Sequence, residues 1–140
     1  MRALLQRRRK IETKFDHVVR RGEQCQTKAE RVSFLIEVNK VERQIREVQQ
    51  AIDMRRQKLG ELLDAILVEM RCLLWAGAAS QAGELAEAAR EVARDLSNDK
   101  DFKWDILRER FERYQRRYHR ESYIGKRDYL KIVEEILRVA

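Results

Sequence analysis

The side chains best suited to metal or nucleophilic chemistry are two histidines, His17 and His119, and two cysteines, Cys25 and Cys72. Together they make a nominal Cys2His2 set, but no two of them have the sequence spacing of zinc ligands. On a helix of 3.6 residues per turn, His17 and Cys25 are turned about 80° from each other. We therefore expect no metal site and no cofactor.

Carboxylates are plentiful, but their spacing indicates surface ion pairs and not acid–base catalysis. Glu42 precedes Arg46 by four residues and Glu109 precedes Arg113 by four, the spacing that joins opposite charges on a helix surface. The sequence contains no glycine-rich phosphate loop, nucleophile elbow or HExxH pattern. We expect a protein that is not an enzyme and has no small-molecule substrate.

A stretch from Trp104 to Tyr123 interleaves aromatic residues with arginines. Guanidinium groups hold phosphates and rings stack on bases, although the same residue types also dominate protein–protein hot spots. Because Phe111, Tyr114 and Tyr118 share one helical stripe, a plain amphipathic helix is favoured, and a protein-binding or polyanion-binding surface stays open. In the polyanion alternative, nonspecific contacts would come from four arginines: Arg113, Arg116, Arg117 and Arg120.

The elements that carry these side chains are predicted to be helices. The 140 residues include no proline and only 5 glycines, and 39% are charged. Proline is the costliest residue inside a helix and normally collects in loops, so its absence favours a nearly all-helical chain.

The apolar spacing predicts an all-α fold with an elongated coiled-coil arm at about residues 27–76. A smaller helical bundle is expected from a first helix, 2–21, and C-terminal helices at 81–96, at 102–121 and after Asp128. We divide the chain into residues 1–76, the first helix plus the long helix, and residues 77–140, three short helices.

The junctions between these helices carry recognisable signals. Gly22 is a candidate left-handed residue that ends the first helix, and Thr27 with Glu30 forms a capping box that begins the next. The alternative is one helix running straight through, because the apolar spacing continues from Val18 to Val32. A second break is expected at residues 76–80 with Ser80 as the cap, and a polar loop at 97–101.

Within the long helix, four/three spacing from Val41 is typical of a coiled-coil seam. Residues 32–38 instead place apolar side chains around most of the helix, which indicates a junction of several helices. After Leu59 the apolar stripe broadens into a face too wide for a two-stranded seam. We expect this face to be the main association surface, with burial under the later helices as the alternative. Its residues are Leu63, Leu67, Met70 and Leu74, beside Trp75.

Charge is unevenly distributed along the chain, whose formal net charge is +7. Residues 1–60 contain 16 Lys and Arg against 8 Asp and Glu, whereas residues 61–100 contain 4 against 8. Basic segments therefore flank an acidic one, which suits an acidic partner or intramolecular docking.

The chain shows no feature of a secreted or membrane-spanning protein. Two cysteines do not make a disulfide framework, and thiols half-buried in helical seams are the expected state. The N-terminal residues lack a signal-peptide core, and the most apolar window, Leu59 to Ala79, is interrupted by charges. We expect a soluble, intracellular protein, most simply cytoplasmic.

The length, basic character and opening heptads resemble the coiled-coil stalk proteins of flagellar and type III secretion export ATPases. That resemblance is architectural and covers about residues 1–75; it implies a two-helix antiparallel coiled coil inserted into a ring. Our leading hypothesis is a non-enzymatic adaptor or scaffold, a coiled-coil subunit that binds a protein partner or itself. The alternatives are a basic nucleic-acid-binding protein and a stalk-like component of an export apparatus.

Overall fold

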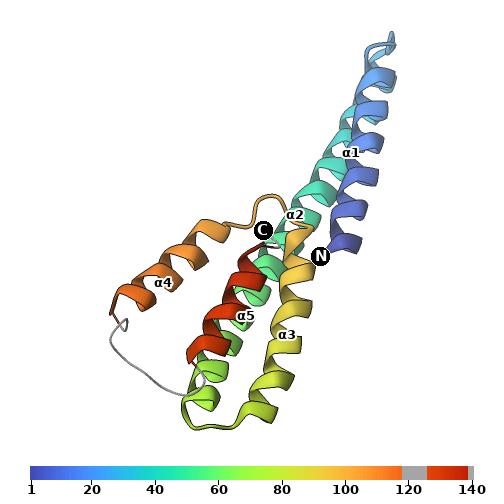
Figure 1. Ribbon diagram of the computed structural model, residues 1–140. Coiled ribbons are helices and arrows are strands. Elements are labelled where there is room, and N and C mark those ends of the chain that lie inside the picture. Colours follow the sequence, from blue (N-terminus) through green and yellow to red (C-terminus); the bar gives the residue numbers. More distant parts are fainter. Residues whose placement is uncertain (118–125, 139–140) are drawn as a thin grey trace. The chain divides into compact units, whose positions relative to one another are not determined.

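The computed structural model describes residues 1–117 and 126–138, and over these ranges the chain is helical with short connections. Five helices follow one another: α1 (Arg2–Gly22), α2 (Lys28–Trp75), α3 (Ala79–Ser97), α4 (Trp104–Arg117) and α5 (Lys126–Arg138) (Figure 1). No strand occurs in the described residues. The prediction of an all-α fold with one long helix and a smaller helical bundle is confirmed, and α2 is 48 residues long.

The chain forms two compact units, Met1–Arg55 and Arg56–Ala140, and the division falls inside α2. In the first unit α1 runs antiparallel to the first half of α2. Arg8 donates a hydrogen bond from Nη1 to Gln49 Oε1 at 3.1 Å, near the start of α1. Near the end of α1, Arg21 forms an ion pair with Glu37 at 2.8 Å. At the end of the hairpin away from the turn, a small apolar cluster packs between the two helices. It contains Met1, Val48 and Ile52, with Leu4, Leu5 and Ile11 packed against them.

The turn between α1 and α2 is present, so the alternative of one uninterrupted helix is wrong. The predicted capping box forms there: the Glu30 N–H donates to Thr27 Oγ1 at 3.1 Å, and the Thr27 N–H donates to Glu30 Oε2 at 3.3 Å. The predicted left-handed conformation of Gly22 is wrong, because Gly77 is the only described residue with a positive φ. Gly22 is needed for space instead, since a Cβ there would lie 2.2 Å from the Phe34 ring.

The second unit is a helical bundle around one apolar core. Its buried residues come from the second half of α2 and from α3, α4 and α5, and none of them comes from α1. The core therefore differs from the predicted bundle, to which the N-terminal helix was expected to contribute. Ion pairs join the helices at the surface of the unit: Arg90 on α3 meets Glu135 on α5 at 3.1 Å, and Arg110 on α4 meets Asp64 on α2 at 2.6 Å.

Helix α3 approaches its neighbours through alanines. The residues of α3 that are buried lie at helical spacing and are Ala82, Ala86, Ala89, Ala93 and Leu96. A stripe of larger side chains at the same helical spacing, Leu85, Ala89, Val92 and Leu96, was also available in this sequence. Leu85 and Val92 are only half-buried. The buried stripe is therefore rotated toward the smaller residues, which let the helix axes come closer.

The end of α2 is a Schellman turn. Gly77 takes a φ of 80°, the Gly77 N–H donates to the Leu74 carbonyl at 3.1 Å, and the Ala78 N–H donates to the Leu73 carbonyl at 2.8 Å. These bonds satisfy carbonyls that the helix end leaves without partners. The break at residues 76–80 is confirmed, but Ser80 is not the cap: α3 begins at Ala79, and Ala78 occupies the N-cap position.

Candidate interaction surfaces

The predicted association face is in the core of the second unit. Leu63 and Met70 are 0% exposed, and Leu67 and Leu74 are 5% exposed. They pack with the alanines of α3 and with Val133 and Ile136 of α5. The alternative, an ordinary core covered by the later helices, is what the structure contains. The sequence overestimated the free surface because it gave no measure of how closely the alanine-rich α3 could approach.

Trp75, the fifth residue of the predicted surface, is 58% exposed. It ends a row of exposed apolar or thiol side chains along α2. At one edge of the row, Val68 borders a depression that the core residues Leu67 and Leu107 also line, and Leu62 lies at the other margin. We call this the outward row: Ala65, Val68, Cys72 and Trp75. At 100° per residue these four positions fall within about 80° of arc. The signal was present in the sequence as three/four spacing, but the adjacent Leu-rich face dominated it.

A second exposed apolar group lies near the start of α2, in the first unit. Val32, Leu35 and Ile36 are 50%, 57% and 65% exposed, and Val32 and Ile36 line a shallow depression. Their positions were predicted to mark a junction of several helices. Within Met1–Arg55 only α1 lies beside α2, so these side chains have no cover in that unit.

The predicted polyanion contacts on α4 are only partly described. Arg113 is exposed and pairs with Glu109, four residues earlier, as the sequence indicated. Arg116 is exposed on the same helix, whereas the side chain of Arg117 and the whole of Arg120 lie outside the described residues. The apolar side of α4 belongs to the core where it is described: Leu107 is 9% exposed and the Phe111 ring packs against the same cluster. Tyr118 and the side chain of Tyr114, which were predicted to share this stripe, are outside the described residues.

Among the described residues, one charged side chain, that of Asp99, is buried, and no local sequence pattern predicts it. The Asp99 side chain is 1% exposed and accepts charge-assisted hydrogen bonds from Nε and Nη2 of Arg56, the latter at 3.2 Å. Asp99 also accepts the backbone N–H of Asp101 at 3.0 Å. The carboxylate thus ties the loop between α3 and α4 to α2. Its satisfied partners explain how a carboxylate is tolerated at this depth.

The capping box perturbs the ionisation of Glu30. Its carboxylate accepts backbone N–H groups from Gln26, at 2.8 Å, and from Thr27. Hydrogen bonds to a carboxylate favour the charged form. They hold the pKa of Glu30 below its ordinary value of 4.5. This group serves the helix start and has no cavity or reactive neighbour beside it.

Reactive and metal-binding groups do not converge in the described part of the chain. Both thiols are free; Cys25 is half-buried as predicted, but Cys72 is exposed, contrary to the prediction. Within residues 1–117 and 126–138, no three His, Cys, Asp or Glu side chains are placed to share a metal ion. None of the helices in those ranges combines the length and apolar content needed to cross a membrane.

Comparisons with known proteins found no counterpart for this arrangement. No protein-family model, no curated protein and no solved structure matches the chain.

Proposed function

We propose that the protein is a non-enzymatic helical subunit of a larger protein assembly, an adaptor or scaffold that binds through the outward row of α2. The observation that supports this proposal is the exposure of apolar side chains along the second half of α2. Val68 is 47% exposed, Leu62 48% and Trp75 58%.

A helix that is apolar on both sides is normally buried on both sides. The second half of α2 has this character: Leu63 and Met70 are buried in the core, whereas Val68 and Trp75 are exposed. Scattered exposed apolar residues are common, but a row along one helix face is a feature of interaction sites. Tryptophan is also enriched among residues that carry binding energy.

A helix from another chain fits this row best. The outward row extends from Ala65 to Trp75, which is about 15 Å at 1.5 Å per residue, or about three turns of helix. Apolar positions at three/four spacing are those that pack against a partner helix. The partner is a different protein or a second copy of this chain, and the experiment below separates the two.

The test compares one substitution at two places on the same helix. Val68→Glu puts a carboxylate in the outward row, and Val32→Glu puts one at a site of similar exposure, 50%, in the other unit. Sedimentation velocity from 1 to 100 µM gives the oligomeric state. Trp75 emission in a Trp104→Phe background reports whether association buries the row, because Trp104 is the other tryptophan.

For self-association, the expected result is a concentration-dependent oligomer and a blue shift of Trp75 emission, both lost in Val68→Glu and kept in Val32→Glu. For a different partner, the chain alone is monomeric, and a purified host protein binds the wild type and Val32→Glu but not Val68→Glu. If both variants associate like the wild type, or if only Val32→Glu fails, the outward row is not the interface.

A stalk-like component of an export apparatus is the second candidate. It is favoured by the antiparallel pairing of α1 with the first half of α2, which the Arg8–Gln49 and Arg21–Glu37 contacts define. Binding of the purified chain to the host's export ATPase, lost on removal of residues 1–26, would support this assignment. Unchanged binding without that segment would exclude α1 as the inserted element.

A further inference from the structure

The charge of the first unit is concentrated on α1. This helix contains 8 Lys and Arg against 2 Asp and Glu, and its first turn has no acidic residue. Only Arg20 and Arg21, in the last turn, lie where the helix dipole favours cations, and neighbouring like charges along the rest of the helix repel. The other six Lys and Arg residues gain nothing from the dipole. The distribution of charge therefore points to a binding role outside the hairpin.

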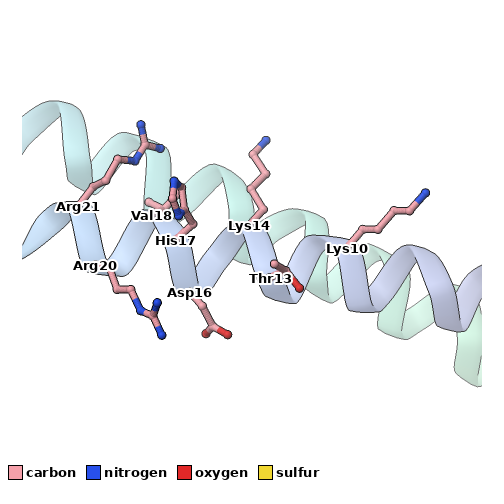
Figure 2. A pocket seen from close by; sticks show the side chains of 8 residues that line it. All are labelled: Lys10, Thr13, Lys14, Asp16, His17, Val18, Arg20 and Arg21. Atoms are coloured by element: carbon pink, nitrogen blue, oxygen red, sulfur yellow. The ribbon is translucent and has the colours of Figure 1, made fainter.

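Five basic side chains of α1 form a single row. We call it the basic row: Arg7, Lys10, Lys14, His17 and Arg21. Their spacings of three, four, three and four keep them within about 80° of arc, over a length of about 21 Å. Figure 2 shows the side chains of Lys10, Lys14, His17 and Arg21 extending to one side of the helix, over a shallow depression in the surface.

The basic row is not neutralised by the hairpin. Arg7, Lys10, Lys14 and His17 are exposed and make no hydrogen bond or ion pair with any residue that the structure describes. Arg21, at the end of the row, pairs with Glu37.

The acidic residues of α1 do not pair with the row. Asp16 lines the same depression, but its side chain projects to the other side of the helix, with Arg20 (Figure 2), and Glu12 is paired with Arg8 at 3.7 Å. The row therefore presents three unpaired cationic side chains to a ligand: Arg7, Lys10 and Lys14.

We propose that the basic row binds the phosphate backbone of nucleic acid without reading its sequence. A strand of duplex DNA carries one phosphate per 3.4 Å of axis, so a row of about 21 Å lies along about six phosphates. No exposed aromatic side chain belongs to the row, so the contacts are electrostatic and position the backbone only. The site is on the first unit and is independent of the outward row proposed above.

An anionic membrane surface fits the row less well than a nucleic acid does. Helices that bind bilayers insert an apolar face next to their basic one. The apolar face of α1 is occupied: Val18 is 1% exposed, and Leu4, Leu5 and Ile11 pack on the cluster that contains Val48 and Ile52. What remains accessible on α1 is mostly charge.

The test measures binding of the full chain to a fluorescein-labelled 30-base-pair duplex by anisotropy, in two unrelated sequences and at 50–200 mM salt. Three phosphate contacts, one for each unpaired Lys or Arg of the row, predict a slope of about −2.7 in log K against log salt, roughly a fortyfold loss of affinity over that range. The triple substitution Arg7→Gln, Lys10→Gln and Lys14→Gln is expected to weaken binding at least tenfold at 100 mM salt and to flatten the slope by nearly 3.

A matched control removes the same charge from another side of the same helix: Arg2→Gln, Arg9→Gln and Arg20→Gln, turned about 100° from the basic row. This variant is expected to lose less than threefold. Glutamine keeps a high helix propensity, and circular dichroism confirms that both variants are folded.

Equal losses in the two variants would mean that diffuse charge, and not the row, binds the duplex. A tenfold preference for one duplex sequence would contradict backbone binding. Tighter binding to phosphatidylserine vesicles than to duplex at the same salt would replace nucleic acid with a membrane surface.

Discussion

The units Met1–Arg55 and Arg56–Ala140 share one continuous helix, yet they bury apolar side chains in different ways. In the first unit α2 has one neighbour, and the fully buried side chains are few: Val18, Val41, Val48 and Ile52 lie at or below 2% exposure. In the second unit α2 is packed with α3, α4 and α5 around one continuous apolar core. One helix thus passes from a paired to a bundled environment.

The two units also differ in net charge. Residues 1–55 contain 14 Lys and Arg against 8 Asp and Glu, whereas residues 56–140 contain 17 against 16. A near-neutral unit with a large core gains its stability from burial. A hairpin with a thin core and excess positive charge depends on helix ends and local contacts, and its surface is free to bind an anion. The predictions below test this contrast, beginning with the largest expected effect.

The core of the second unit is the most sensitive region. Leu67→Glu places an unpaired carboxylate at a position that is 5% exposed, which we expect to cost about 4 kcal/mol and to unfold much of the bundle. Val68→Glu, one residue further and 47% exposed, should cost less than about 0.5 kcal/mol. Urea unfolding followed by circular dichroism measures both. Similar costs for the two variants would show that the face of α2 is assigned incorrectly.

The buried ion pair should rank next. Asp99→Asn leaves the Arg56 guanidinium facing a neutral group in a site where the aspartate side chain is 1% exposed, and we expect a loss of about 3 kcal/mol. Asp101→Asn is the matched control, because that carboxylate is 66% exposed and lies 3.5 Å from Arg56; it should lose less than about 0.5 kcal/mol. If the control costs as much as Asp99→Asn, the buried pair contributes nothing specific.

Local signals in the sequence predicted the helices and the turn, and the structure confirms them. The absence of proline, the capping box at Thr27 and Glu30 and the glycine at position 77 each act through neighbours in the chain. The failures concern tertiary packing. Whether Leu67 is core or interface depends on how close the alanines of α3 come, and the partner of Asp99 is 43 residues away in sequence. Neither the close approach of α3 nor the Arg56–Asp99 contact can be predicted from residues that are neighbours in the sequence.

Two glycines separate a steric requirement in the first unit from a backbone requirement in the second. At Gly22 the φ is ordinary, but an added Cβ meets the Phe34 ring; at Gly77 the space is open, but φ is 80°. We expect Gly22→Ala and Gly77→Ala each to cost about 1 kcal/mol, for these different reasons. Asparagine tolerates positive φ better than alanine but is larger.

Asn should therefore be better than Ala at position 77 and worse than Ala at position 22. Thermal unfolding of the four variants measures the order. The same order at both positions would contradict this division of roles. Hydrogen exchange should also show which helix loses amide protection: α1 in the Gly22 variants and α3 in the Gly77 variants.

An effect of similar size is expected at the start of α2, where the first unit depends on its capping box. Thr27→Ala removes the acceptor for the Glu30 N–H and should cost about 1 kcal/mol.

The Glu30 carboxylate makes the stability of this turn depend on pH, and the direction of that dependence follows from its pKa. Backbone hydrogen bonds lower its pKa in the folded chain below 4.5, so the folded state binds this proton less readily than the unfolded state. The stabilisation is present above pH 4.5 and is lost as the pH falls through the lowered pKa. NMR titration of the Glu30 carboxyl should give a midpoint below 4.5, and Thr27→Ala should leave it lowered while the turn persists, because the backbone N–H groups of residues 26 and 27 still donate to the carboxylate. A midpoint for Glu30 at or above 4.5 would show that the capping box does not persist in solution.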